Sequence, residues 1–418
     1  MKEKGIRYPT KGYVRLLVFV VFWVFVRYYR IKRNIPAEVR NLKRPYLLLS
    51  NHVGLWDPFI IGHLLPRFTH FVSSDAAFRD PVNGFFLPRL GTIPKKKNVR
   101  DTQVIRDIIQ VLRQGENVGL FPEAVRNWAG STLPIDRSIA KLIKLVEVPV
   151  IVAVSRGMNL FNPRWSRKIR RTKVEVSYRI LLDTDQIQTL SVDTIYNRIV
   201  SALQHDEVAH QRKHLNPVLS QKRAEHINHT LFVCPECHSI DPFRPSGNQF
   251  SCAKCDYTIS IDKYCFFEVK SSHKLHFDNI RDWYNWQEAW LSQHIFNIYD
   301  QASEEVIFKD ENVKLYEAED DRSMRFIGIA QMILYWDRIV LKLGPGRPDR
   351  ILTIRELQTI NPQVNEQLEI IYPQAFYRVT GIRPGVSGLK WEVAVNALWK
   401  KMGQQHKLAP YIKMPECN

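Results

Sequence analysis

Three short polar stretches in the first half of the chain carry side chains suited to acid–base chemistry. They read Asn-His-Val-Gly-Leu-Trp-Asp-Pro from residue 51, Gly-Thr-Ile-Pro-Lys-Lys-Lys from residue 91 and Phe-Pro-Glu-Ala-Val-Arg-Asn from residue 121. In the first stretch His52 precedes Asp57 by five residues. A carboxylate that holds one nitrogen of an imidazole leaves the other nitrogen to act as a general base. The spacing therefore indicates His52 and Asp57 as a candidate catalytic pair.

A histidine five residues before an aspartate is weak evidence alone, because this chain contains three such pairs: His52 with Asp57, His70 with Asp75, and His273 with Asp278. The first pair differs in its position. It follows a predicted buried strand, and Asp57-Pro58 is typical of the start of a helix. The alternative interpretation is an ordinary loop histidine beside an aspartate that caps a helix. The pair considered in isolation leaves both interpretations open.

Alternating strands and helices are predicted to position these stretches. Apolar runs predict strands at 46–50, 118–121 and 149–154, and a further strand is predicted at 173–182. Helical spacing predicts helices at 104–112, 138–146 and 194–203. Strands that are apolar throughout and separated by helices indicate an α/β domain, with a mainly parallel sheet covered on both faces. In such sheets the chemistry lies at the carboxyl ends of the strands. The first and third polar stretches each follow a predicted strand.

The order of these motifs resembles the glycerophospholipid acyltransferase family, which includes the 1-acylglycerol-3-phosphate acyltransferases. That family shows NHxxxxD, then G-x-I-P-x-x-R, then F-P-E-G-T-R-S, then an apolar strand with V-P-[IV]. The present chain has NHVGLWDP, GTIPKKK, FPEAVRN and VPVIVAV in the same order. The resemblance covers roughly residues 10–215, about half of the chain.

The resemblance implies acyl transfer from a thioester, either acyl-CoA or acyl carrier protein, to the hydroxyl of a lysophospholipid. The expected acceptor is 1-acylglycerol-3-phosphate, and the product is phosphatidic acid. His52 would act as the general base and Asp57 would orient it. The acceptor's hydroxyl attacks directly, so no serine or cysteine nucleophile is needed.

The same resemblance implies a set of substrate-binding residues. Arg126 and Lys97 would bind the phosphate of the acceptor. Glu123 would contact a glycerol hydroxyl or hold Arg126 in place. Backbone N–H groups near Gly91 and Ile93 are candidate oxyanion donors.

The chain departs from the family pattern at four positions. Lys97 stands where the family usually has arginine, which keeps the charge but loses the bidentate geometry for phosphate. Ala124 and Val125 replace glycine and threonine, and Asn127 replaces serine. These changes make the backbone of the loop less flexible and remove two hydroxyl groups from it. The acceptor of this chain can therefore differ from that of the family.

An apolar run at the start of the chain suggests contact with a membrane. Residues 16–26 are eleven apolar residues between Arg15 and Arg27. A membrane-spanning helix needs about 20 such residues, so residues 1–40 are predicted to form a helical segment that lies in the headgroup layer. The alternative is a buried core helix. The expected location is the cytoplasmic face of a membrane, as a monotopic or peripheral protein.

The charge of the chain is distributed unevenly. Residues 1–220 carry a net charge of +19 and the remainder −1, which together give the +18 of the whole chain. A basic first half favours an anionic partner such as a lipid surface. Basic runs at 95–100 and 164–173 support this interpretation, although a charge run is also typical of a solvated face. The neutral second half makes nucleic acid an unlikely partner.

Four cysteines in two CxxC pairs predict a metal site in the second half. Cys234 with Cys237 and Cys252 with Cys255 are separated by a spacing that fits a closed tetrahedral site holding one structural zinc. Disulfides or redox-active pairs are the alternative, and they require an oxidising compartment or a thioredoxin-like context. The predicted zinc ribbon spans residues 228–265.

The remaining residues, 266–418, are predicted to form a helix, a series of strands and a closing helix. This pattern resembles the pleckstrin-homology/GRAM-like superfold, which does not by itself indicate a function. With an acyltransferase domain at 41–220, the chain is expected to be a membrane-associated enzyme. The alternative is a non-enzymatic adaptor, or a nucleic-acid binder, that is tethered to membrane and contains a degenerate acyltransferase domain.

Overall fold

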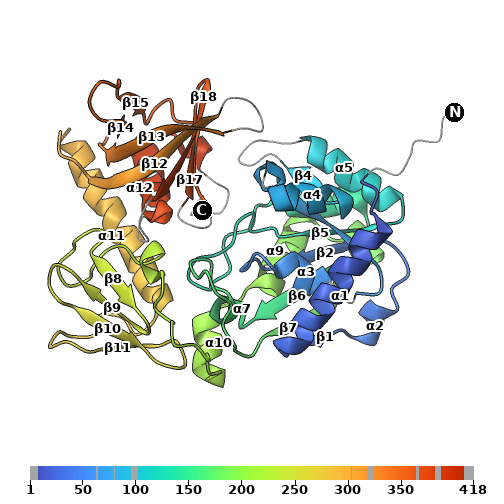
Figure 1. Cartoon of the computed structure of the whole chain (residues 1–418). Helices are drawn as coiled ribbons and strands as arrows, with labels where there is room; N and C mark the ends of the chain where they lie inside the picture. Colours follow the sequence, from blue (N-terminus) through green and yellow to red (C-terminus); the bar gives the residue numbers. More distant parts are fainter. Residues whose placement is uncertain are drawn as a thin grey trace. The chain divides into compact units, whose positions relative to one another are not determined.

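The computed structural model describes residues 8–62, 65–79, 81–95, 102–302, 304–318, 324–363, 367–381 and 387–408. The chain forms two compact units. The first contains the described parts of 1–164 and 170–217, and the second those of 165–169 and 218–409 (Figure 1).

A seven-stranded sheet in the order β1-β7-β6-β2-β5-β3-β4 organises the first unit. Every neighbouring pair is parallel except β6 and β7, so the predicted mainly parallel sheet is confirmed. Three short strands, β1, β3 and β4, were not predicted because they lack a continuous apolar run. The strands are β1 (Lys32–Asn34), β2 (Leu47–Ser50), β3 (Thr69–Ser74), β4 (Ile93–Lys95), β5 (Asn117–Leu120), β6 (Val150–Arg156) and β7 (Glu175–Leu182).

Helices cover both faces of this sheet. On one face, apolar side chains of α5, α6 and α9 pack with those of the central strands in a buried core. On the other face, the Tyr178 hydroxyl of β7 donates to the carbonyl of Ile61 in α3 at 2.7 Å. The helices are α1 (Gly12–Tyr28), α2 (Ala37–Arg40), α3 (Asp57–Gly62), α4 (Pro81–Arg89), α5 (Thr102–Arg113), α6 (Ser138–Val146), α7 (Met158–Phe161), α8 (Thr184–Thr189), α9 (Val192–Leu203) and α10 (Glu207–His214), with a 3-10 turn η1 (Asp75–Arg79).

Helix α1 has one packed face and one exposed apolar face. Val14, Phe22 and Val26 are buried, and the ring of Phe22 stacks on Phe59 of α3 at 4.6 Å between centroids. On the exposed face, side chains such as Leu17 and Val24 are about half accessible. Within the described residues, no helix combines the length and the apolar character needed to cross a bilayer.

The second unit begins with a small antiparallel sheet built around the cysteine pairs. Its order is β11-β10-β9-β8. Trp283 of α11 (Ile280–Asp300) is fully buried against this sheet, and its indole N–H donates to the Val233 carbonyl at 3.0 Å. Trp283 therefore packs helix α11 onto the small sheet. The elements are η2 (Ile227–His229), β8 (Phe243–Ser246), β9 (Gln249–Cys252), β10 (Thr258–Ile261) and β11 (Phe267–Val269).

A second seven-stranded sheet, antiparallel throughout, follows in the order β15-β14-β13-β12-β18-β17-β16. It is curled and is accompanied by a helix near the end of the chain, so it resembles the predicted pleckstrin-homology-like domain (Figure 1). The elements are β12 (Phe308–Ala318), β13 (Met324–Leu334), β14 (Arg338–Lys342), β15 (Arg350–Thr353), β16 (Thr359–Pro362), β17 (Gln367–Tyr372), β18 (Ala375–Gly381), α12 (Gly388–Lys401) and η3 (Gln405–Lys407).

A buried lysine joins the two sheets of the second unit. Lys390 of α12 is 0% exposed and pairs with Asp310 of β12 at 2.6 Å and with Asp241, which lies just before β8. Burial lowers the pKa of Lys390 to about 7. A buried cation requires paired carboxylates because its desolvation costs several kcal/mol. The ribbon sheet and the C-terminal sheet therefore share one polar connection.

Candidate active site

The loops after β2, β5 and β6 meet at one edge of the first sheet. These strands are neighbours, with β2 between β5 and β6, and all three run parallel. The loop after β2 carries His52, and the loop after β5 carries Glu123 and Arg126. The carboxyl ends of the strands thus bring together residues that are more than 70 positions apart in the sequence.

His52 and Asp57 form a hydrogen-bonded pair. Nδ1 of His52 lies 2.9 Å from Oδ2 of Asp57. The same oxygen accepts the backbone N–H groups of Val53 at 2.7 Å and Gly54 at 2.9 Å, so it is bonded to the loop that precedes α3. Asp57 is 0% exposed, and the His52 side chain is 19% exposed. Burial lowers the pKa of His52, and the Asp57 carboxylate opposes this shift.

Two residues that the sequence did not single out as site residues hold His52 in place. Phe121 stacks on the imidazole at 4.2 Å between ring centroids. Asn127 donates both its backbone N–H, at 3.1 Å, and its side-chain amide, at 3.2 Å, to the His52 carbonyl. Asn127 stands where the related family has serine. Its side-chain amide has two N–H donors and one carbonyl acceptor in place of the serine hydroxyl.

Glu123 supports the same loop. Its Oε1 accepts the backbone N–H of His52 at 2.8 Å, and its Oε2 accepts that of Leu133 at 2.7 Å. The carboxyl group is 1% exposed, and burial raises its pKa to about 8 against the opposing effect of the two donors. Both carboxylate oxygens of Glu123 thus accept backbone N–H groups. Glu123 therefore fixes the distance between the loops that follow β2 and β5.

Arg126 brings a cation to the site, and the structure adds a second one. The pKa of Arg126 falls to about 9 because the group is buried and because Arg164 is near, while Asp57 opposes the shift. Arg164 follows β6, and its Nη1 donates to the Arg126 carbonyl at 2.8 Å. In the sequence, Arg164 belongs to a basic run that is predicted to contact lipid. Its position after a central strand was the signal that could have placed it at the site.

The motif that begins at Gly91 connects α4 to β4. Gly91 has a φ of +65°, and its carbonyl contacts Nδ1 of His70 at 2.8 Å. The N–H groups of Gly91 and Thr92 donate to the carbonyls of Pro88 and Leu87, so both already have acceptors within the chain. Ile93 is the first residue of β4, and its side chain is fully buried in the core. This geometry does not favour the prediction of oxyanion donors here. Lys97 lies outside the described residues.

The other two histidine pairs have different surroundings. His70 is buried against the Gly91 carbonyl. His273 lies in the second unit, where its Nδ1 contacts the Ser271 hydroxyl at 3.0 Å.

The four predicted metal ligands converge in the second unit. Their sulfur atoms all lie within 4.8 Å of one another. The Cys234–Cys255 and Cys237–Cys252 sulfur pairs are 3.7 and 3.6 Å apart. Four thiolates at about 2.3 Å from a zinc ion in a tetrahedron have nearly this separation, and they leave no ligand position open. The cluster therefore suits a structural metal such as zinc.

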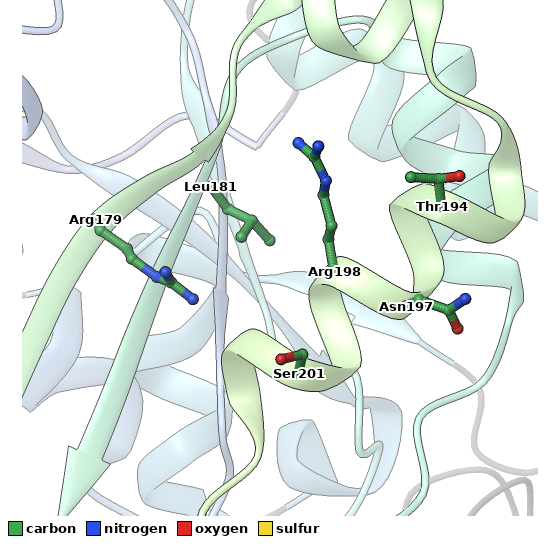
Figure 2. A pocket seen from close by; sticks show the side chains of 6 residues that line it. All are labelled: Arg179, Leu181, Thr194, Asn197, Arg198 and Ser201. Atoms are coloured by element: carbon green, nitrogen blue, oxygen red, sulfur yellow. The ribbon is translucent and has the colours of Figure 1, made fainter.

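An open pocket lies elsewhere on the first unit, between β7 and α9. It has a volume of about 560 Å³ and contains Leu181 between Arg179 and Arg198 (Figure 2). It contains none of the predicted site residues.

Comparisons with known proteins agree with the first unit's motifs. Residues 27–156 match the family model described as Acyltransferase. The 1-acyl-sn-glycerol-3-phosphate acyltransferase of Bacillus subtilis (strain 168) is 24% identical over 127 residues, which cover 30% of this chain and 60% of the relative. The present chain thus spans less than two thirds of that relative's length.

Two solved structures are similar to parts of the chain. The 1-acyl-sn-glycerophosphate acyltransferase from Thermotoga maritima has 16% sequence identity and a TM-score of 0.38, covering 45% of this chain and 78% of that one. The Vps36 N-terminal PH domain has 18% identity and a TM-score of 0.20, covering 24% of this chain and 82% of that one. From the family match and the curated relative, the chain contains an acyltransferase domain with distant homology to 1-acyl-sn-glycerol-3-phosphate acyltransferases.

Proposed function

We propose that this protein is a membrane-associated acyltransferase that moves an acyl chain from a thioester to the hydroxyl of a lysophospholipid. The observation that carries the proposal is the 2.9 Å contact between Nδ1 of His52 and the buried Asp57. This contact sets the tautomer that leaves Nε2 unprotonated, and Nε2 has no hydrogen bond within the described residues. An imidazole held in this way is suited to accept a proton from an alcohol.

The reaction proceeds in two proton transfers at the same nitrogen. Nε2 of His52 takes the proton of the acceptor's hydroxyl as the oxygen attacks the thioester carbonyl. The Asp57 carboxylate stabilises the imidazolium that forms. When the tetrahedral intermediate collapses, the C–S bond breaks and the leaving thiolate receives the proton from Nε2. The products are an ester and a free thiol, and His52 returns to its starting state.

The lowered pKa of His52 agrees with this role because it keeps the imidazole neutral, and therefore basic, at neutral pH. Arg126, with Lys97, would bind the acceptor's phosphate, and the expected acceptor is 1-acylglycerol-3-phosphate. The acyl donor would be acyl-CoA or acyl carrier protein.

The exposed apolar face of α1 supports a position at the surface of a membrane. Several large side chains along this helix are between 45% and 65% accessible, and Arg15 and Arg27 flank the apolar run. Insertion of such a face into the headgroup layer removes apolar surface from water, while the cations remain near anionic lipid. A lysophospholipid acceptor resides in the same layer.

The metal site has a separate role in this proposal. Cys234, Cys237, Cys252 and Cys255 would hold one zinc that stabilises the ribbon. A zinc ion with four thiolate ligands contributes folding free energy rather than reactivity.

The test is an acyl-transfer assay on the purified full chain. It is incubated with acyl-CoA and a panel of lysophospholipids, and the products are identified by mass spectrometry. His52→Ala is expected to leave less than about a tenth of the wild-type activity, since a general base contributes roughly 10²- to 10⁴-fold. His273→Ala serves as the matched control and should leave turnover unchanged. Activity that survives His52→Ala would refute this mechanism.

A further inference from the structure

We infer that Arg164 and Arg126 together form the binding site for the acceptor's phosphate, and that this pair selects a phosphomonoester over a zwitterionic lysolipid. The inference rests on the proposed function, because it concerns the acceptor of that reaction. Arg164 lies eight residues after the end of β6 and is separate from the four motifs that define the family resemblance.

The Arg164 guanidinium is held by two contacts within the first unit. Nη1 donates to the Arg126 carbonyl at 2.8 Å, and the guanidinium carbon lies 3.9 Å from the centroid of the Trp128 ring. Trp128 is 8% exposed, so the stacking surface is itself fixed in the core. A cation over an aromatic face and bonded along one edge loses little further freedom when a ligand binds.

The guanidinium groups of Arg126 and Arg164 repel each other, since the charge of Arg164 lowers the pKa of Arg126. Within the part of the chain that the structure describes, the Arg126 side chain makes no hydrogen bond or ion pair. The nearby Asp57 carboxylate is already bonded to His52, Val53 and Gly54. Arg126 and Arg164 both lower the pKa of His52, so their charges act on the candidate base. An anion that binds next to His52 would relieve this repulsion.

The charge of the ligand follows from this arrangement. A phosphomonoester carries a charge of about −1.5 to −2 at neutral pH and offers three terminal oxygens. Two planar guanidinium groups match that charge and can each donate two parallel hydrogen bonds. A phosphocholine headgroup has one negative charge, offers fewer free oxygens and carries a cation that would be repelled. The pair therefore favours an acceptor that ends in a phosphomonoester.

The first experiment compares the kinetics of Arg164→Gln, Arg164→Lys and the wild type, with 1-acylglycerol-3-phosphate and 1-acylglycerophosphocholine as acceptors. Arg164→Gln should raise KM for the phosphomonoester by about 10- to 100-fold, since it removes a charge-assisted hydrogen bond. At a pH above the pKa of His52, the value of kcat should change by less than about threefold, because the His52–Asp57 pair remains in place. Arg164→Lys should recover part of the loss, as it restores the charge without the planar geometry.

The matched control is Arg198→Gln, an exposed arginine of α9 at the separate pocket (Figure 2). It should leave both KM values unchanged. An equal rise in KM for the two acceptors in Arg164→Gln would overturn the selectivity. A rise confined to KM for acyl-CoA would show that Arg164 serves the donor's phosphates, and would also overturn the inference.

The second experiment separates this inference from the proposed function. Binding of sn-glycerol 3-phosphate to the full chain is measured by titration calorimetry, which needs no turnover, and thermal unfolding checks that each variant is folded. Weaker binding to Arg164→Gln, by about tenfold or more, would support the phosphate site even if no acyl transfer were found. Equal binding to the wild type and to folded Arg164→Gln and Arg164→Lys would refute it, even if acyl transfer were established.

Discussion

The Glu123 carboxylate accepts the backbone N–H of His52 at 2.8 Å, so the glutamate of the third motif supports the histidine of the first. Its other oxygen accepts the N–H of Leu133 at 2.7 Å. A residue whose type suggests contact with substrate is thus engaged by the protein's own backbone. The buried side chains of Glu123 and Asn127 thus both join the loops after β2 and β5.

Replacement of Glu123 should therefore destabilise the fold. Glu123→Ala leaves two part-buried N–H groups without these acceptors, and each costs about 1–3 kcal/mol, so we expect the free energy of unfolding to fall by about 2–5 kcal/mol. Urea denaturation measures this change. Glu38→Ala, at an exposed position of α2, is the control and should change it by less than about 0.5 kcal/mol. Similar values for the two variants would contradict the supporting role.

The raised pKa of Glu123 predicts a dependence of stability on pH. In the unfolded chain this carboxyl loses its proton near its ordinary pKa of 4.5, whereas in the folded chain it does so at about 8. The folded state therefore holds the additional proton between these values, and the contribution of Glu123 to stability should fall as pH rises through this window. Urea denaturation of the wild type and of Glu123→Gln at pH 5, 6.5 and 8 isolates the effect. If the difference in the free energy of unfolding between the two proteins stays constant with pH, the pKa of Glu123 is not raised in the folded state.

The acid limb of the pH–rate profile should report the protonation of His52. Because burial lowers the pKa of His52, the limb for kcat/KM is expected below the ordinary histidine value of 6.5. Asp57→Asn removes the opposing effect of the carboxylate, and should move the limb further towards acid and reduce kcat. Steady-state rates in a series of overlapping buffers provide the measurement. A limb at or above 6.5 in the wild type would mean that another group is the base.

Ala124 has a left-handed backbone at the position where the related family has glycine. Its φ of +63° costs roughly 1–2 kcal/mol for a residue with a Cβ atom. Ala124→Gly should therefore raise the free energy of unfolding by about 0.5–1 kcal/mol, after allowing for the greater freedom of glycine in the unfolded chain. Ala209→Gly, within α10, should lower it by about 1 kcal/mol. Chemical denaturation measures the free energy of unfolding of both variants. A lower value for Ala124→Gly than for the wild type would contradict the prediction that the backbone of Ala124 is strained.

Metal analysis should find one zinc per chain in protein prepared without chelator. Cys237→Ser should lower the zinc content and unfold the ribbon, since binding of the metal contributes folding free energy. The effect should extend to the C-terminal sheet, because Asp241 of the ribbon pairs with the buried Lys390 of α12. Cys265→Ser should retain the zinc. Protein that contains no metal and remains fully folded would disprove the site.

The exposed face of α1 provides the membrane prediction. Leu17, Val20 and Val24 are each about half accessible, and changing all three to glutamine should lower binding to anionic vesicles by about tenfold or more, since each apolar side chain contributes to insertion. Folding should be unaffected. The core-facing variant Phe22→Ala should instead lower the free energy of unfolding by about 3 kcal/mol. Flotation with liposomes and urea denaturation distinguish the two. Undiminished flotation of the triple variant would place the membrane contact elsewhere.

The sequence by itself determined the local features of this protein. Apolar runs marked β2, β5 and β6 because strands buried on both faces need no polar alternation. Helical spacing located α5, α6 and α9, and the cysteine spacing identified four ligands whose sulfurs do converge. The order of the four polar and apolar motifs was enough to indicate the acyltransferase domain. In each case the evidence lies within a short segment, where periodicity and residue type are informative.

Only the tertiary structure decided which of these residues act together. Arg164 reaches Arg126, and Asn127 reaches the carbonyl of His52, because parallel strands bring distant loops to one edge of the sheet. Glu123 accepts two backbone N–H groups because a buried polar group needs hydrogen-bond partners, and the fold supplies them here. Ile93 lies in the core because β4 joins the sheet at that residue. These pairings join residues that are dozens of positions apart in the sequence. A pattern within a short segment cannot predict them.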